Sequence, residues 1–269
     1  MRVYISADME GVAGIVNDSF TDSKGQNYHR GCKLQTEEVN ACIQGALEAG
    51  ADQVLVNDSH GAMTNIIVEN IDNKAELITG APKPLGMMEG VADGIDAAFF
   101  TGYHSGQKQA GVLSHTYNYS VAELKVNGIS MGETGINALV AGYYNVPVAL
   151  VSGDDRVTEE AANLLGTNVV TAAIKTSLSR TSAKTLTPLK AQELLREKSK
   201  KAILGINQLK PWTMTPPYNL ELSFNDRGMA EKARLLPGAE LAANSTLMYQ
   251  TEDIRELYDA FRTMLVLAR

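Results

Sequence analysis

Short apolar runs alternate with helix-like patterns through the first two-thirds of the chain. Apolar residues recur at intervals of three and four over residues 39–47 and 136–143, which predicts two helices, and Gly50 is suited to end the first. Asn127-Gly128 predicts a hairpin turn. Buried strands are predicted at residues 3–7, 54–56, 76–79, 97–100 and 146–151. This alternation predicts an α/β fold with a mostly parallel sheet covered by helices.

The last third of the chain follows a less regular pattern. Prolines interrupt it between residues 211 and 217. Further strands and helices are predicted at residues 168–174, 188–203, 220–224 and 254–265. We therefore predict an α/β domain over residues 1–175 and a smaller α+β lobe over residues 176–269, with no linker to mark the boundary.

Composition narrows the class of protein and its partners. The 269 residues are 44% hydrophobic, which is enough for a well-filled core, and the net charge of −7 does not favour binding to nucleic acid. The amino terminus reads as a strand without the regions of a signal peptide, and no apolar run approaches the ~20 residues that span a membrane. We expect a cytoplasmic protein with neither a membrane nor a nucleic-acid partner. Cys32 and Cys42 form neither a disulfide framework nor a metal-binding spacing.

Acids and histidines follow three of the predicted strands directly. Asp8 and Glu10 come after the first strand, Asp58 and His60 after the second, and His104 after the run that ends near residue 100. In open α/β sheets, ligands bind beyond the carboxyl ends of the strands. A single buried histidine is more often structural, but this joint placement predicts that the side chains meet at one edge of the sheet.

The carboxylates of Asp8 and Glu10 are separated by one residue. In a continuing strand they point to the same face, where they repel each other unless a cation neutralises them. The alternative is that Asp8 caps the following loop while Glu10 is solvated. Glu133 begins a predicted helix, where the helix dipole alone explains a carboxylate, although the position also suits a ligand. The residues leave both interpretations open.

Oxygen and imidazole ligands together suit zinc, with manganese or cobalt as substitutes. Five ligands exceed the three that one catalytic zinc takes from a protein, and they suit two ions roughly 3.5–4 Å apart. Asp8, as the first residue after the strand, is the natural bridge. The candidate ligands are Asp8, Glu10, His60, His104 and Glu133.

Two rival functions fit the same residues. A phosphoesterase or amidohydrolase uses similar metals, but a phosphoesterase adds Arg or Lys beside them, for which only Lys83 and Arg156 are candidates. A non-catalytic metal-binding protein usually closes its site with four ligands, often cysteines. The segment from Asp154 to Arg156 could line the cleft, but we favour it as a cap of the next helix.

At these residues the chain resembles the zinc D-aminopeptidases of the DppA type. The resemblance runs through Ser6-Ala7-Asp8-Met9-Glu10-Gly11, Val56-Asn57-Asp58-Ser59-His60, Gly102-Tyr103-His104, Ser114-His115, Gly132-Glu133 and Ser152-Gly153-Asp154-Asp155-Arg156. It implies two zinc ions per chain with Asp8 as the shared ligand, short peptide substrates with an N-terminal D-amino acid, and pentameric rings stacked into homodecamers. It also implies a catalytic role for His115, as nucleophile. On chemical grounds we favour proton transfer by His115, since zinc-bound hydroxide already supplies a nucleophile.

Overall fold

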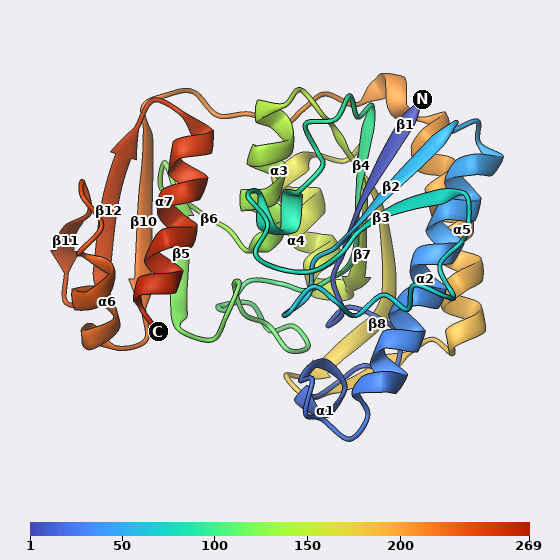
Figure 1. Ribbon diagram of the computed structural model, residues 1–269, viewed down its shortest axis with the longest axis horizontal. Helices are drawn as coiled ribbons and strands as arrows, with labels where there is room; N and C mark the ends of the chain where they lie inside the picture. Colours follow the sequence, from blue (N-terminus) through green and yellow to red (C-terminus); the bar gives the residue numbers. More distant parts are fainter.

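Two sheets organise the molecule, and the computed structural model describes residues 1–269 (Figure 1). The larger sheet has the strand order β3-β2-β1-β4-β7-β8-β9, and the smaller has the order β11-β12-β10-β5-β6. The larger sheet contains β1 (Arg2–Ala7), β2 (Gln53–Asp58), β3 (Ala75–Ile78), β4 (Ala97–Tyr103), β7 (Val148–Asp154), β8 (Val170–Ser179) and β9 (Ser182–Thr185). The smaller sheet contains β5 (Val121–Val126), β6 (Ile129–Ser130), β10 (Tyr218–Phe224), β11 (Glu240–Ala243) and β12 (Thr246–Thr251).

The larger sheet is parallel from β3 to β8, and only β9 pairs antiparallel. This confirms the predicted α/β architecture, in which helices carry the crossovers between parallel strands. The helices are α1 (Asp18–Thr21), α2 (Tyr28–Glu48), α3 (Glu133–Tyr143), α4 (Asp155–Leu165), α5 (Pro188–Leu204), α6 (Arg227–Ala233) and α7 (Ile254–Leu267), with single 3₁₀ turns at η1 (Gly86–Met88) and η2 (Ile206–Gln208). None of these helices combines the length and the apolar character that a membrane crossing requires.

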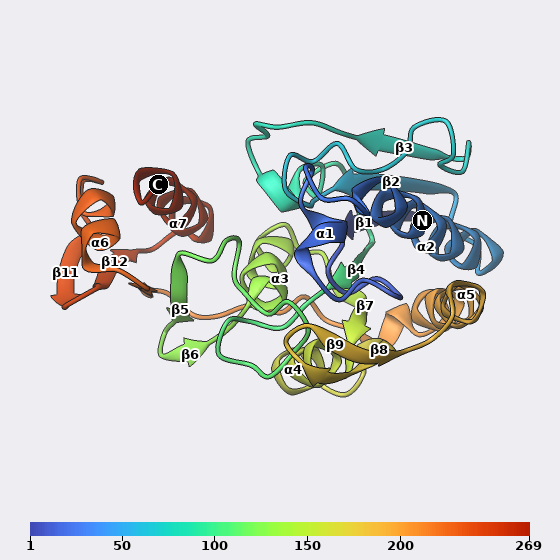
Figure 2. The ribbon, with the colours of Figure 1, turned by 90° about the horizontal axis from the view of Figure 1, so that it is seen from below.

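The central strand β1 is buried on both faces. Val3 and Ile5 pack in one core with α2 and α5, while Tyr4 points into the other core, which α3 and α7 share. This split follows from the alternation of side chains along a strand. Figures 1 and 2 show α2 and α5 on the side of the sheet away from the smaller sheet. Both faces of the sheet are therefore covered, and only the ends of its strands remain available for ligands.

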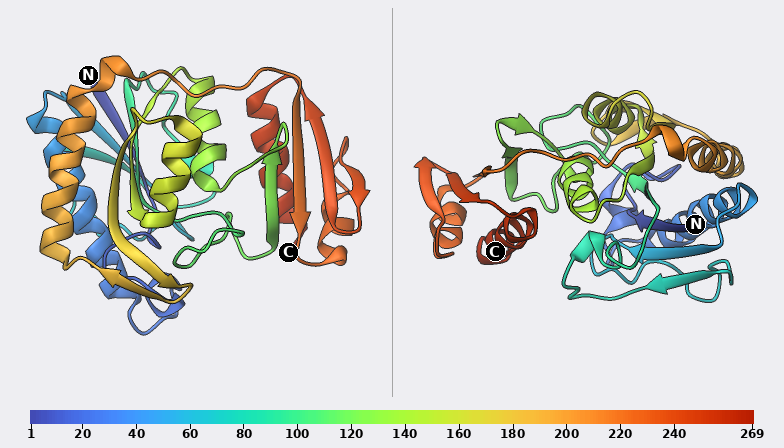
Figure 3. Two further views of the ribbon diagram at one scale, coloured as in Figure 1. Left: turned by 180° about the vertical axis from the view of Figure 1, so that it is seen from behind. Right: turned by 90° about the horizontal axis from the view of Figure 1, so that it is seen from above.

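The smaller sheet is antiparallel and packs against α7. Leu220, Leu222 and Phe224 alternate inward along β10, as predicted for a half-buried strand. Its strands come from two separate parts of the chain, since β5 and β6 precede α3 while the others follow the long stretch after η2 that crosses between the sheets (Figure 3). The expected division at residue 175 falls within β8 and stays a prediction.

Strand order places a topological switch at the centre of the larger sheet. From β1 the chain moves outward through β2 and β3, and then returns to the other side of β1 with β4. After β1 and after β4 the chain therefore continues toward opposite faces of the sheet, which is the arrangement that forms a ligand-binding crevice at the carboxyl ends of the strands. The backbones touch there, because the amide of Asp8 donates to the Thr101 carbonyl at 2.8 Å and that of Gly11 donates to the Gly102 carbonyl at 2.8 Å.

We expect Gly102→Ala to destabilise the fold by at least ~2 kcal/mol. Gly102 has a φ of +67°, and a Cβ there would lie 2.3 Å from the Asp8 carbonyl oxygen. Urea unfolding at matched protein concentration measures the loss. Gly205→Ala is the control, because Gly205 has a φ of −92° and its nearest contact would be 3.3 Å. Equal stability of the two variants would contradict this account of the switch point.

Candidate metal centre

The six predicted site residues meet at the carboxyl edge of the larger sheet. Asp8 and Glu10 lie in the loop after β1, His60 after β2, His104 after β4, and Glu133 is the first residue of α3. His115 lies against His104, with the two rings stacked and their centroids 4.0 Å apart. All except His60 are buried, and His60 is half-buried.

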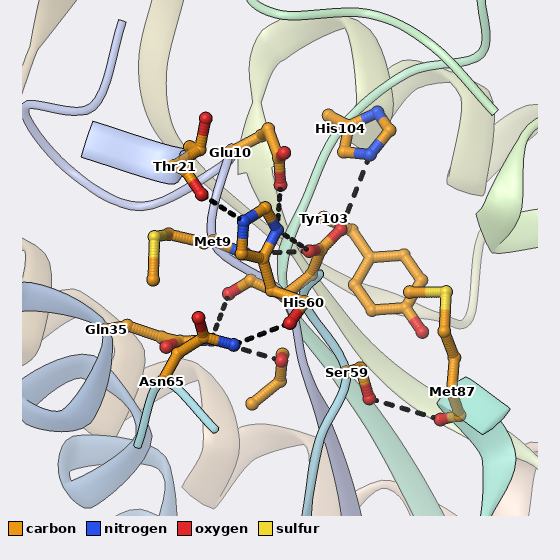
Figure 4. A network of polar contacts seen from close by, with 12 residues as sticks. Met9, Glu10, Thr21, Gln35, Ser59, His60, Asn65, Met87, Tyr103 and His104 are labelled. Carbon is orange, nitrogen blue, oxygen red and sulfur yellow. Dashed lines mark hydrogen bonds and ion pairs between the residues drawn. The ribbon is translucent and has the colours of Figure 1, made fainter. Parts of the chain in front are cut away.

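Asp8 lies between two histidines, His60 and His104. Figure 4 shows both rings, with Glu10 and Thr21 beside His60. One of its oxygens is 3.2 Å from His60 Nδ1, and the other is 3.4 Å from His104 Nε2. Each histidine also contacts a second carboxylate, since His60 Nδ1 is 3.1 Å from Glu10 and His104 Nε2 is 3.3 Å from Glu133. The arrangement therefore has two halves joined by one carboxylate.

Backbone carbonyls orient the three imidazoles. His60 Nε2 donates to the Thr21 carbonyl at 2.8 Å, His104 Nδ1 to that of Ser105 at 3.1 Å, and His115 Nδ1 to that of Leu113 at 2.9 Å. A carbonyl only accepts, so each of these nitrogens carries a proton. In the neutral ring the other nitrogen presents a lone pair toward the acids, which is how proteins orient histidines that bind metals.

Several buried atoms of the cluster lack a hydrogen-bond partner. Asp8 Oδ2, Glu10 Oε2 and His104 Nε2 are buried and make no hydrogen bond, and their only close polar neighbours are other members of the cluster. Leaving such groups unsatisfied is unfavourable, more so for charged ones. Ligand atoms of Asp8, Glu10 and His104 lie within 4.8 Å of one another, and so do those of His104, His115 and Glu133. The donor set and its unpaired lone pairs fit divalent cations.

Electrostatics favour positive charge inside the cluster. Burial raises the pKa of Asp8, and the Glu10 carboxylate raises it further, to about 6. Burial disfavours the charged imidazoles, but the acids outweigh it and raise the pKa of His60 and that of His104 well above their ordinary value. Burial, followed by the neighbouring His104, lowers the pKa of His115. His115 is thus the neutral base of the group.

A family model for D-aminopeptidases matches residues 1–263 of the chain. The chain belongs to the D-aminopeptidase family. A D-aminopeptidase of Bacillus subtilis (strain 168) is 44% identical over 271 residues, which cover 100% of this chain and 98% of the relative. The solved structure of the Zn-dependent D-aminopeptidase DppA from Bacillus subtilis, a self-compartmentalizing protease, superposes with a TM-score of 0.97 at 43% identity, covering 100% and 98% of the two chains.

Two buried ionisable side chains not predicted from the sequence, Lys175 and Glu38, hold the loop after β1 in this D-aminopeptidase family member. Lys175 Nζ donates to three backbone carbonyls, those of Glu10 at 2.5 Å, Val12 at 3.0 Å and Ile15 at 2.6 Å. Glu38 accepts from the Ala13 amide at 2.8 Å. Lys175 directly follows the strand predicted at residues 168–174, and its position next to this apolar run is the feature of the sequence that indicates burial.

Carboxylates outside the cluster fix the remaining loops. Asp58 accepts from the amides of Asn65 and Ile66 rather than joining the cluster, and so shapes the loop that carries His60. Asp154 caps α4, as favoured from the sequence, and its other oxygen accepts from the Val112 amide at 2.6 Å. Glu160 accepts from the amides of Gly106 and Gly132, at 3.1 and 3.0 Å. It thereby ties the loop of His104 to the start of α3.

A cavity of about 860 Å³ opens beside the cluster. Its wall includes Asp8, Glu10, His60, His115 and Glu133, together with the last residues of α7. Cavities of this size accommodate small organic ligands, and a short peptide is of that size. The site therefore combines a cation-binding cluster with room for a substrate.

Glu38→Gln is expected to change how stability depends on pH. Burial raises the pKa of Glu38 from 4.5 to about 7, so the folded protein keeps a proton that the unfolded chain releases in that range. Stability contributed by this group is complete below pH 4.5 and is lost as pH rises through 7. Relative to wild type, the variant should gain about 3 kcal/mol across the window. Denaturant unfolding at several pH values measures the difference, and parallel curves for the two proteins would refute it.

Proposed function

We propose that this chain is a zinc-dependent aminopeptidase that removes D-amino acids from the N-termini of short peptides. The observation that carries the proposal is the Asp8 carboxylate, whose two oxygens face Nδ1 of His60 and Nε2 of His104, the ring nitrogens that are not bonded to a backbone carbonyl. Family membership supports a peptidase over the rival phosphoesterase, amidohydrolase and non-catalytic readings. The solved relative is described as Zn-dependent.

Two zinc ions per chain would be held in the two halves of the cluster. Glu10 and His60 would serve one ion, His104 and Glu133 the other, and Asp8 would be shared. Manganese or cobalt offers similar coordination to this mixed set of ligands. When bound, such ions polarise a carbonyl and lower the pKa of water to near 7.

His115 would transfer the protons. Its Nδ1 is held by the Leu113 carbonyl, so Nε2 is the basic atom, 3.8 Å from Glu133. In this role Nε2 accepts a proton from the attacking water as the C–O bond forms. It then returns a proton to the leaving amine as the C–N bond breaks, so no net proton is gained or lost. Direct attack by His115, implied by the resemblance, is the alternative, and it requires a covalent acyl-imidazole.

Substrate stereochemistry, assembly and location are further parts of the proposal. We expect a preference for a D-residue at the N-terminus and pentameric rings stacked into homodecamers. The solved relative, described as self-compartmentalizing, supports an oligomer. A cytoplasmic location stays a prediction from the sequence.

Hydrolysis of D-Ala-D-Ala and L-Ala-L-Ala, with zinc measured on the same sample, tests the function. We expect about two zinc equivalents per chain, a higher kcat/KM for the D-peptide, and no hydrolysis after strong chelation. Asp8→Asn should lose both ions, because one carboxylate serves both halves of the cluster.

Lys200→Met, an exposed change on α5, is the control for the Asp8 variant and should keep full zinc content. Hydrolysis that survives complete removal of metal would end the zinc proposal. Zinc-dependent hydrolysis of aryl phosphates in place of peptides would end the peptidase proposal.

His115→Ala should keep its zinc and lose turnover by about 10²–10⁴-fold, the usual contribution of a general acid–base group. Metal analysis with steady-state kinetics on D-Ala-D-Ala measures both quantities. Rapid quenching of the wild-type reaction, followed by mass spectrometry, distinguishes the two roles, because only direct attack leaves an acyl group on His115. Full activity of the variant would exclude both roles.

A further inference from the structure

Two cations without an anionic partner lie together in the wall of the cavity. Lys83 Nζ donates to Asn57 Oδ1 and to the Asp58 carbonyl, both at 2.6 Å. The guanidinium of Arg262 donates to the Pro84 carbonyl at 2.5 Å and to that of Lys83 itself at 2.9 Å. Neither side chain takes part in any ion pair within 4.0 Å.

All the partners of these cations are neutral oxygens. Lys83 is 6% exposed, and burial lowers its pKa to about 8, so the ammonium is still mostly protonated at neutral pH. An ammonium has three donors and a guanidinium has five, so Lys83 keeps one unused and Arg262 keeps three. Two like charges in the wall of one cavity, neither of them in an ion pair, are unfavourable in a partly buried site. A bound anion would relieve this repulsion.

Contacts with Gly86 and Tyr258 hold the Arg262 guanidinium in place. The Arg262 guanidinium lies over Gly86, where a Cβ would be 3.1 Å from Cζ. The ring of Tyr258 supports the same guanidinium from 5.6 Å. Arg262 is thus held between the turn after β3 and α7 rather than extended into solvent.

The cation pair is close to the metal cluster. Both cations line the cavity that Asp8, Glu10 and His60 also line. The Asp58 carbonyl that accepts from Lys83 is two residues before His60, a separation of at most ~7 Å along the backbone. A peptide chain spans ~3.3–3.6 Å per residue. A carboxylate at Lys83 would therefore be within reach of a short peptide whose peptide bond is held at the cluster in the same cavity.

We infer that Lys83 and Arg262 form a subsite that binds the C-terminal carboxylate of a di- or tripeptide, which rests on the proposed aminopeptidase function. Charge-assisted hydrogen bonds from a lysine and an arginine suit a carboxylate. The subsite measures substrate length, because only a peptide that ends one or two residues past the cleaved bond reaches it. An amidated peptide, or the N-terminus of a long chain, leaves the cation pair unpaired.

The test compares D-Ala-D-Ala with its C-terminal amide on the zinc-loaded enzyme and on Lys83→Met and Arg262→Met. Wild type should prefer the free acid by about tenfold or more in kcat/KM, mainly through KM, as expected for a lost charge-assisted hydrogen bond. Each variant should lose most of that preference, because its kcat/KM for the acid falls further than its kcat/KM for the amide. Lys200→Met is the control and should keep the wild-type ratio.

Equal rates on acid and amide with wild type would overturn the inference, and so would an unchanged ratio in both variants. Full recovery of the preference by D-Ala-D-Glu-amide would also overturn it, since a side-chain carboxylate would then be the ligand. If Lys83→Met does not fold, the acid and amide rates of wild type and of Arg262→Met still test the subsite, because Arg262 is more exposed than Lys83.

A binding measurement separates this inference from the proposed function. Calorimetry with an analogue in which CH2–NH replaces the scissile amide, prepared as acid and as amide, needs no hydrolysis. Tighter binding of the acid, lost in Arg262→Met, supports the subsite even if no peptide is cleaved. Equal affinities reject the subsite even if peptides are cleaved.

Discussion

Repulsion among buried acids is the constraint on which the site depends. Asp8, Glu10 and Glu133 are each no more than 3% exposed, and they lie within 3.4 Å of the imidazoles of His60 and His104. Burial of uncompensated carboxylates is costly, so the native arrangement requires positive charge among them. Much of the surrounding structure can be understood as the support that keeps these acids in place.

That support comes from buried polar groups with satisfied hydrogen bonds. Lys175 uses all three of its donors on the loop after β1, while Glu160 connects the loop of His104 with the start of α3. Each such group is costly to bury alone and becomes favourable only through its complete set of partners. The loops that carry the cluster are therefore held in place by groups that lie outside it.

The central strands and the meeting of the candidate site residues were predictable because each depends on a local pattern. Acids and imidazoles directly after Ala7, Asp58 and Tyr103 lie at the carboxyl ends of adjacent parallel strands, and the strand order places them at the switch point. The start of α2 was not predicted. The helix begins at Tyr28 rather than near residue 39, because its first half buries polar residues such as Gln35 and Glu38 that serve the loops and break the apolar period. The pairing of β5 with β10 in the second sheet was also not predicted, since two strands about a hundred residues apart in the sequence leave no local signal of their pairing.

The candidate ligands are spread from residue 8 to residue 133, on four separate segments of the chain. No short stretch of unfolded polypeptide can bring them together, so the proposed ions would bind the folded state far better than the unfolded chain. By mass action, a ligand that binds only the native form raises the free energy of unfolding with the logarithm of its free concentration. The concentration of free metal around the protein would thus set its stability against unfolding and proteolysis, as well as its activity.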